Sequence, residues 1–135
     1  MRLVVDTNIL FSFFNSRSTA RDLSTRYNLI LYSPEFALEE LDKYKNVIMK
    51  RFSLTEMQYV FIIKLLQTVV NFIEKGKYEK FFLKAKKVSP DPDDIDFFAL
   101  CLKLNCQLWS NDAVLKKQSS VDVLSTADLA EKFDL

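Results

Sequence analysis

The chain has 135 residues, about half of them apolar, with 19 basic and 18 acidic side chains, so it predicts one globular domain over residues 1–135 rather than a disordered chain. It contains one glycine and no histidine. The first fact excludes glycine-rich phosphate loops, and the second excludes Ser-His-Asp catalysis and imidazole zinc sites. Carboxylate oxygens remain, and they suit hard cations such as Mg²⁺ and Mn²⁺.

The cysteine content and the N-terminus indicate a cytoplasmic location. Cys101 and Cys106 are expected to be core thiols of a reduced protein rather than a disulfide framework. Asp6 interrupts the first apolar run too early for a secretory signal, and no apolar stretch is long enough to span a membrane. We therefore expect a cytoplasmic protein with no membrane partner.

The first half of the chain alternates apolar runs with amphipathic stretches. Leu3–Val5 predicts a strand buried on both faces, and a helix is expected to begin at Thr7 or Asn8. The elements expected next are helix 18–27, strand 29–32, helix 34–48, helix 55–66 and strand 69–73. The N-caps expected for these helices are Ser16 or Ser18, then Ser33 followed by Pro34, and then Thr55.

The helix expected over 34–48 has one apolar face. Ala37, Leu41, Tyr44 and Ile48 recur at helical spacing, which predicts that all four are buried. Glu40 lies at the rim of that face and can reach a cleft from there.

The second half continues the alternation. A basic amphipathic helix is expected over 77–87, with its aromatic side chains inward. Asp91 is the expected N-cap of a buried helix that starts at Pro92 and ends at Asn105. The remaining elements are expected as strand 106–110, a short helix from 112, strand 121–124, and a last helix to 133 capped by Ser125 or Thr126. This order predicts a three-layer α/β/α sandwich with a central parallel sheet of four to five strands.

Four acidic residues fall at points that such a fold brings to one edge of the sheet. Asp6 closes the first strand and Asp112 follows the fourth, while Glu40 and Asp94 lie early in helices. Ligands bind at this edge in open parallel sheets. Four converging carboxylates repel one another, so the cluster predicts either a metal site or acids that share protons. Asp94 and Asp112 also suit helix starts, and Glu40 suits a solvated face, so Asp6 is the strongest single candidate.

The motifs around these acids resemble those of PIN domains. The segments that carry the resemblance are Asp6-Thr7-Asn8 after a buried strand, Ser33-Pro34-Glu35 through Glu40-Leu41, Asp91-Pro92-Asp93-Asp94 through Ala99, and Trp109-Ser110-Asn111-Asp112. They occur in the family's order and span essentially the whole chain. The spacing to Ala99 and Asp112 matches the family's third acid to Asp94, with Asp93 and Asp96 as alternatives.

This resemblance implies a metal-dependent endoribonuclease that cleaves single-stranded or looped RNA. It implies that Asp6, Glu40, Asp94 and Asp112 bind Mg²⁺ or Mn²⁺, with Asp6 bridging two ions if two are bound. Many members are VapC-type toxins held by an antitoxin protein, others act in RNA processing, and homodimers are common. The residues expected to orient these acids or to assist them are Asn8, Ser110 and Asp96. The residues expected to contact RNA are Arg17, Arg21, Lys116 and Lys117, each of which also suits a solvated surface.

Two other functions are consistent with parts of the pattern. A non-catalytic PIN-fold module that binds RNA or protein would share the fold but would not need all four acids. A phosphatase with an aspartate nucleophile would also place Asp6 at a strand end. Haloacid-dehalogenase enzymes, however, carry a second aspartate two residues later, where this chain has Asn8.

Overall fold

A five-stranded parallel sheet forms the centre of the computed structural model, which describes residues 1–26 and 28–133. The strands lie in the order β3-β2-β1-β4-β5. Their bounds are β1 (Arg2–Val5), β2 (Ile30–Pro34), β3 (Val70–Ile73), β4 (Gln107–Trp109) and β5 (Val123–Leu124). Leu3, Val4 and Val5 are fully buried in the middle strand, as their unbroken apolar run predicted. The predicted parallel sheet is confirmed.

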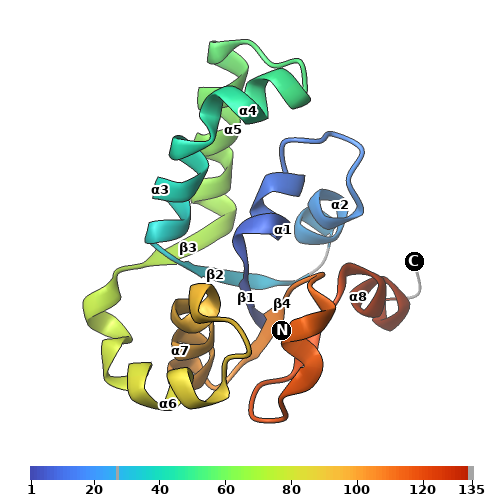
Figure 1. Ribbon diagram of the computed structural model, residues 1–135. Coiled ribbons are helices and arrows are strands. Elements are labelled where there is room, and N and C mark those ends of the chain that lie inside the picture. The colour runs from blue at the N-terminus through green and yellow to red at the C-terminus, as the bar shows by residue number, and fades with distance from the viewer. Residues whose placement is uncertain (27, 134–135) are drawn as a thin grey trace.

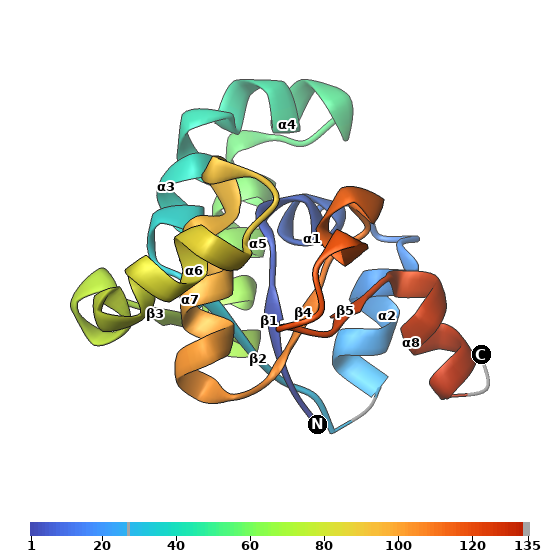
Figure 2. The same ribbon diagram turned by 60° about the horizontal axis from the view of Figure 1, so that its bottom comes forward.

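Helices cover both faces of this sheet and complete the predicted three layers. Figure 1 shows α1, α2 and α3 above the sheet and α6 and α7 below it, while Figure 2 shows α8 beside α2. The α-helices are α1 (Thr7–Ser12), α2 (Thr19–Arg26), α3 (Phe36–Lys43), α4 (Lys45–Arg51), α5 (Glu56–Val69), α6 (Phe82–Val88), α7 (Ile95–Leu104) and α8 (Thr126–Lys132). Short 3₁₀ turns are η1 (Lys75–Lys77), η2 (Glu79–Phe81), η3 (Pro92–Asp94) and η4 (Ala113–Lys117).

The helix N-caps follow local sequence signals in most places. Thr55 accepts the Gln58 N–H and the Gln58 side chain accepts the Thr55 N–H, which closes a capping box. Ser125 and Asp128 form a second capping box at the start of α8. Asp91 caps η3, as predicted. The predicted end of the second helix, Tyr27, lies outside the described residues.

The prediction for Ser33 and Pro34 was wrong. Strand β2 continues through Pro34, and α3 begins after Glu35 without a side-chain cap. The Ser33 hydroxyl is fully buried and donates a hydrogen bond to the Val5 carbonyl at 2.9 Å. The Ser33 side chain therefore bonds to the neighbouring strand β1 and not to the start of a helix, where the local pattern had placed it.

Two predicted helices are interrupted. The backbone leaves helical geometry at Tyr44 (φ −99°, ψ 17°), which divides the predicted helix 34–48 into α3 and α4. Ala37, Leu41 and Ile48 are buried as predicted, but Tyr44 is 41% exposed. The predicted basic helix 77–87 becomes η1, η2 and then α6, and the buried Tyr78, which donates a hydrogen bond to Asp96 of α7, lies between η1 and η2.

The strands and helices of the C-terminal half agree with their patterns in kind. Phe98, Ala99 and Leu100 of α7 are fully buried, and Asn105 ends that helix in the left-handed conformation at φ 49°. β4 and β5 begin later than predicted, at Gln107 and Val123. Cys101 and Cys106 are free thiols. Over the described ranges 1–26 and 28–133, none of the helices combines the length and apolar character of a membrane span.

Candidate active site

Asp6 is a buried carboxylate at the carboxyl end of β1. It is only 5% exposed, and its Oδ1 accepts the Ile9 N–H at 2.9 Å, so it also caps α1. The Ser110 hydroxyl, at the end of the neighbouring strand β4, donates a second hydrogen bond to this side chain. Burial raises the pKa of Asp6, and the charge of Asp112 raises it further, while these hydrogen bonds act in the opposite direction.

A cleft of about 410 Å³ opens next to Asp6. β1 is followed by β2 and β3 toward one edge of the sheet, whereas β4 is followed by β5 toward the opposite edge, so the topological switch point lies between β1 and β4. The cleft lies at this point. The cleft is lined by Asp6, Thr7, Asn8, Phe11, Glu40, Tyr44, Asp93, Asp94 and Phe97. Four of these side chains are acidic, and the lining includes no lysine or arginine. We call it the acid cleft.

Glu40 reaches the acid cleft from α3, as predicted from its place at the rim of the apolar face. The Thr7 hydroxyl on α1 donates a hydrogen bond to Glu40 Oε1 at 2.9 Å. This contact joins the start of α1 to α3 and fixes one carboxylate at the wall. Sequence reasoning did not single out Thr7, although it lies directly after Asp6 in the motif Asp6-Thr7-Asn8.

Asp94 lies at the end of η3, half-buried, on the same cleft. Burial, together with the charges of neighbouring acids, raises the pKa of Asp94 from 3.8 to about 7. The acids that contribute are, in order of effect, Asp91, Asp6, Asp112 and Asp93. A carboxyl group with this pKa is a characteristic of ligand and catalytic sites.

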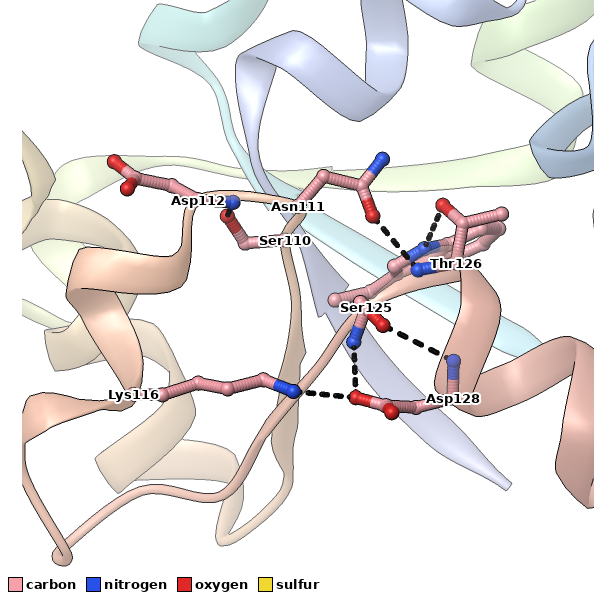
Figure 3. A network of polar contacts seen from close by, with 8 residues as sticks. Ser110, Asn111, Asp112, Lys116, Ser125, Thr126 and Asp128 are labelled. Atoms are coloured by element: carbon pink, nitrogen blue, oxygen red, sulfur yellow. Dashed lines mark hydrogen bonds and ion pairs between the residues drawn. The ribbon is translucent and has the colours of Figure 1, made fainter.

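Asp112 lies beside the acid cleft rather than among its lining residues. Its Oδ1 accepts the Val114 N–H at 3.0 Å, and its own N–H donates to the Ser110 hydroxyl oxygen at 3.1 Å. Figure 3 shows its carboxylate directed away from Ser110. Its charge nevertheless acts on both Asp6 and Asp94. The four predicted acids therefore gather at one end of the sheet.

The acids do not form a ready-made cage for an ion. Within the described residues, no three side chains of the acid, cysteine or histidine types are placed so that they could hold a metal together. The donor set itself fits a hard divalent cation, because it offers carboxylate oxygens without a competing basic side chain in the cleft wall.

The remaining acids of the 91–96 segment differ in their surroundings. Asp93 lines the acid cleft and is exposed. Asp96 instead accepts a hydrogen bond from the Tyr78 hydroxyl at 2.6 Å and is not among the cleft's lining residues. The structure thus gives Asp96 a partner in the packing between α7 and the segment before α6.

The predicted RNA-contacting residues are dispersed. Arg21 lines a different cavity, which it shares with Phe14 and Met57. Lys116 pairs with Asp128 at 2.6 Å, as Figure 3 shows. Arg17 and Lys117 are exposed. None of the four lines the acid cleft, whereas Asn8 does.

Comparison with known proteins identifies the family and the fold. A family model of the PIN domain matches residues 4–131, nearly the whole chain, so this chain belongs to the PIN-domain family. Its fold is similar to a chain in the crystal structure of VapBC2 from Rickettsia felis bound to a DNA fragment from their promoter. The TM-score is 0.64 at 15% identity, over 93% of this chain and 98% of that chain. A search of curated proteins gave no match.

Proposed function

We propose that this protein is a divalent-metal-dependent endoribonuclease that hydrolyses phosphodiester bonds in single-stranded or looped RNA. The observation that supports it most is the acid cleft at the switch point of a PIN fold, with four carboxylates and no basic side chain in its lining. Such a cleft repels RNA unless a cation neutralises it, which couples substrate binding to metal binding.

The residues that would hold Mg²⁺ or Mn²⁺ are Asp6, Glu40, Asp94 and Asp112. The chemistry supplied at such a site is Lewis-acid activation of water and stabilisation of charge on phosphate oxygens. The chain's own residues prepare the ligands. Hydrogen bonds from Ile9 and Ser110 hold Asp6 in one orientation, and the Thr7 hydroxyl holds Glu40. Burial and neighbouring acids raise the pKa of Asp94 to about 7, so a bound cation would favour its ionised form.

Cleavage of single-stranded RNA tests the proposal directly. End-labelled RNA is incubated with wild-type protein in Mn²⁺, in EDTA, and with Asp6→Asn, which keeps an oxygen acceptor for the Ile9 N–H. We expect cleavage by the wild type in Mn²⁺ only, with 5′-phosphate and 3′-hydroxyl products. If the wild type has no metal-dependent cleavage, or if Asp6→Asn cleaves equally well, the enzyme proposal is wrong.

Single substitutions in the 93–96 segment identify the third acid. We expect Asp94→Asn to abolish cleavage, because Asp94 is the half-buried acid of the cleft and is influenced by both Asp6 and Asp112. Asp93→Asn should reduce cleavage less, and Asp96→Asn should act through stability, since Asp96 is engaged by Tyr78. If only Asp93→Asn loses cleavage, Asp93 and not Asp94 is the third metal ligand.

The cellular role that we propose is the toxin of a toxin–antitoxin pair that works as a homodimer. The similarity in fold to a chain of the VapBC2 complex supports this assignment. Co-expression with the product of the neighbouring gene tests it. Relief of growth inhibition together with co-purification would support it, whereas a chain that does not inhibit growth would exclude a toxin.

A second candidate function is a non-catalytic PIN-fold module. The observation that favours it is that no three acids of the described chain are placed, as they stand, so that they could hold one metal ion together. It predicts RNA binding that is independent of Mn²⁺ and no cleavage product, so the experiment above distinguishes the two functions.

A further inference from the structure

A second hollow continues from the acid cleft along α1 to α4. It has a volume of about 450 Å³, and Asn8, Phe11 and Tyr44 line both cavities. Its other wall includes Arg51 and Phe52, at the end of α4, the helix at the top of Figure 1. We call this hollow the α4 pocket. A chain that crosses the acid cleft can therefore continue into the α4 pocket without leaving the surface depression.

An exposed aromatic ring stands at the junction of the two cavities. Tyr44 occupies the break between α3 and α4 and is 41% exposed. Its ring lies 6.2 Å from that of Phe11, measured between centroids, at an angle of 55°, and the Lys43 Nζ lies 5.6 Å from its centre. A base can stack on Tyr44 once the flexible lysine side chain moves aside, and a partly exposed aromatic ring is the usual platform for such stacking in single-stranded nucleic acids.

The α4 pocket carries the charge that the acid cleft lacks. Among the cations of α4, Arg51 lines the pocket, whereas Lys45 pairs with Glu56 at 2.7 Å outside it. The Arg51 guanidinium lies 5.6 Å from the centre of the Phe52 ring, and both residues line the pocket. Ser12 and Asn15 add polar groups to the lining. This combination of an aromatic ring, a guanidinium and polar donors complements a nucleotide better than an apolar peptide.

We propose that the α4 pocket binds one unpaired nucleotide of the RNA beside the cleaved bond, with its base stacked on Tyr44 and a flanking phosphate at Arg51. This inference rests on the proposed function for the identity of the ligand. It deepens that function because it makes an unpaired nucleotide at one defined position a requirement of the substrate. A base held in a duplex cannot reach Tyr44 without being unstacked from its neighbours.

Binding without cleavage tests this. The affinity of a short fluorescein-labelled single-stranded RNA is measured at low salt in Ca²⁺, which neutralises the acid cleft, and the RNA is checked to be intact after the titration. Tyr44→Ala should raise Kd about ten-fold, while Tyr44→Phe, which keeps the ring, should stay within about two-fold of wild type. Phe61→Ala is the matched control, because Phe61 is an exposed aromatic residue of a different cavity.

The charge contribution has its own signature. Arg51→Ala should reduce the slope of log Kd against log salt by about 0.7, as expected for one phosphate contact on a single strand, and Arg51→Lys should restore it. Lys132→Ala on α8 is the control cation and should leave the slope unchanged. An RNA that carries 2-aminopurine should change fluorescence on binding to wild type but not to Tyr44→Ala.

Three results would overturn the proposal: Tyr44→Ala binds RNA like wild type, Phe61→Ala weakens binding as much as Tyr44→Ala, or a blunt duplex binds as tightly as the single strand. Urea midpoints of the variants show whether each is folded. If cleavage fails but these Kd differences persist, the proposed nuclease function is wrong while the nucleotide pocket stands. If cleavage succeeds without them, only the pocket is wrong.

Discussion

Asp94→Asn should stabilise the metal-free protein and at the same time abolish its activity. The pKa of Asp94 is raised from 3.8 to about 7 by burial and by neighbouring acids. The folded protein therefore binds this proton more tightly than the unfolded chain does. Between about pH 4 and pH 7, unfolding releases the proton, so stability is present at low pH and is lost as the pH rises. Asparagine has the shape of the neutral carboxyl group and cannot ionise, so the variant should not lose stability as the pH rises.

The size of the effect follows from the same shift. Each unit of pKa corresponds to about 1.4 kcal/mol, which sets an upper limit of about 4 kcal/mol for a shift from 3.8 to about 7. Asp94 is only half-buried, and water screens the repulsion it feels, so we expect about 1–2 kcal/mol at pH 7.5. At pH 5 the carboxyl is protonated in the folded protein but ionised in the unfolded chain, so the difference should fall to roughly a third of its value at pH 7.5 and vanish only below about pH 4.

Urea unfolding in EDTA at pH 7.5 and pH 5 measures this. The control is Asp122→Asn, an exposed acid just before β5, which should show no pH-dependent gain. Saturating Mn²⁺ should raise the unfolding free energy of wild type and have little effect on Asp94→Asn. The reasoning is refuted if Asp94→Asn is no more stable than wild type at pH 7.5, or if its gain is equal at pH 5.

Three further substitutions test how the side chains of the site are held. Ser110→Ala removes the hydrogen-bond donor to the buried Asp6 carboxylate, so it should lower the unfolding free energy in urea by about 1–2 kcal/mol and also slow cleavage. Ser110→Thr should restore both, and an unchanged urea midpoint for Ser110→Ala would contradict the hydrogen bond. Thr7→Val removes the hydrogen bond to Glu40, so it should slow cleavage about ten-fold with a small change in stability. Thr7→Ser should cleave at nearly the wild-type rate, and equal cleavage rates in the two variants would show that the contact is dispensable. Tyr78→Phe loses the hydrogen bond to Asp96, so it should lower the unfolding free energy by about 1.5–3 kcal/mol without changing the cleavage rate of the folded protein. A loss of cleavage rate without a loss of stability would instead give Asp96 a part in the reaction.

The corrected helix boundaries show where local patterns fail. Thr55 and Asp91 were identified as caps because their partners lie within three residues, where sequence spacing fixes geometry. Ser33 carries the same local signal, but the Val5 carbonyl on the neighbouring strand takes its hydroxyl. Tyr44 has the spacing of a buried residue, yet a break in the helix turns it outward. A partner on another strand decided the first case, and the break between α3 and α4 decided the second.

The sequence by itself determined the alternation of strands and helices and the placement of Asp6 at a strand end, because side-chain periodicity and buried apolar runs act over a few residues. The tertiary structure alone decided that Thr7 meets Glu40, that Lys116 is taken by Asp128, and that Arg21 turns to another cavity. These contacts join residues far apart along the chain, and their energies depend on how whole layers pack. No spacing rule within one element can supply that information.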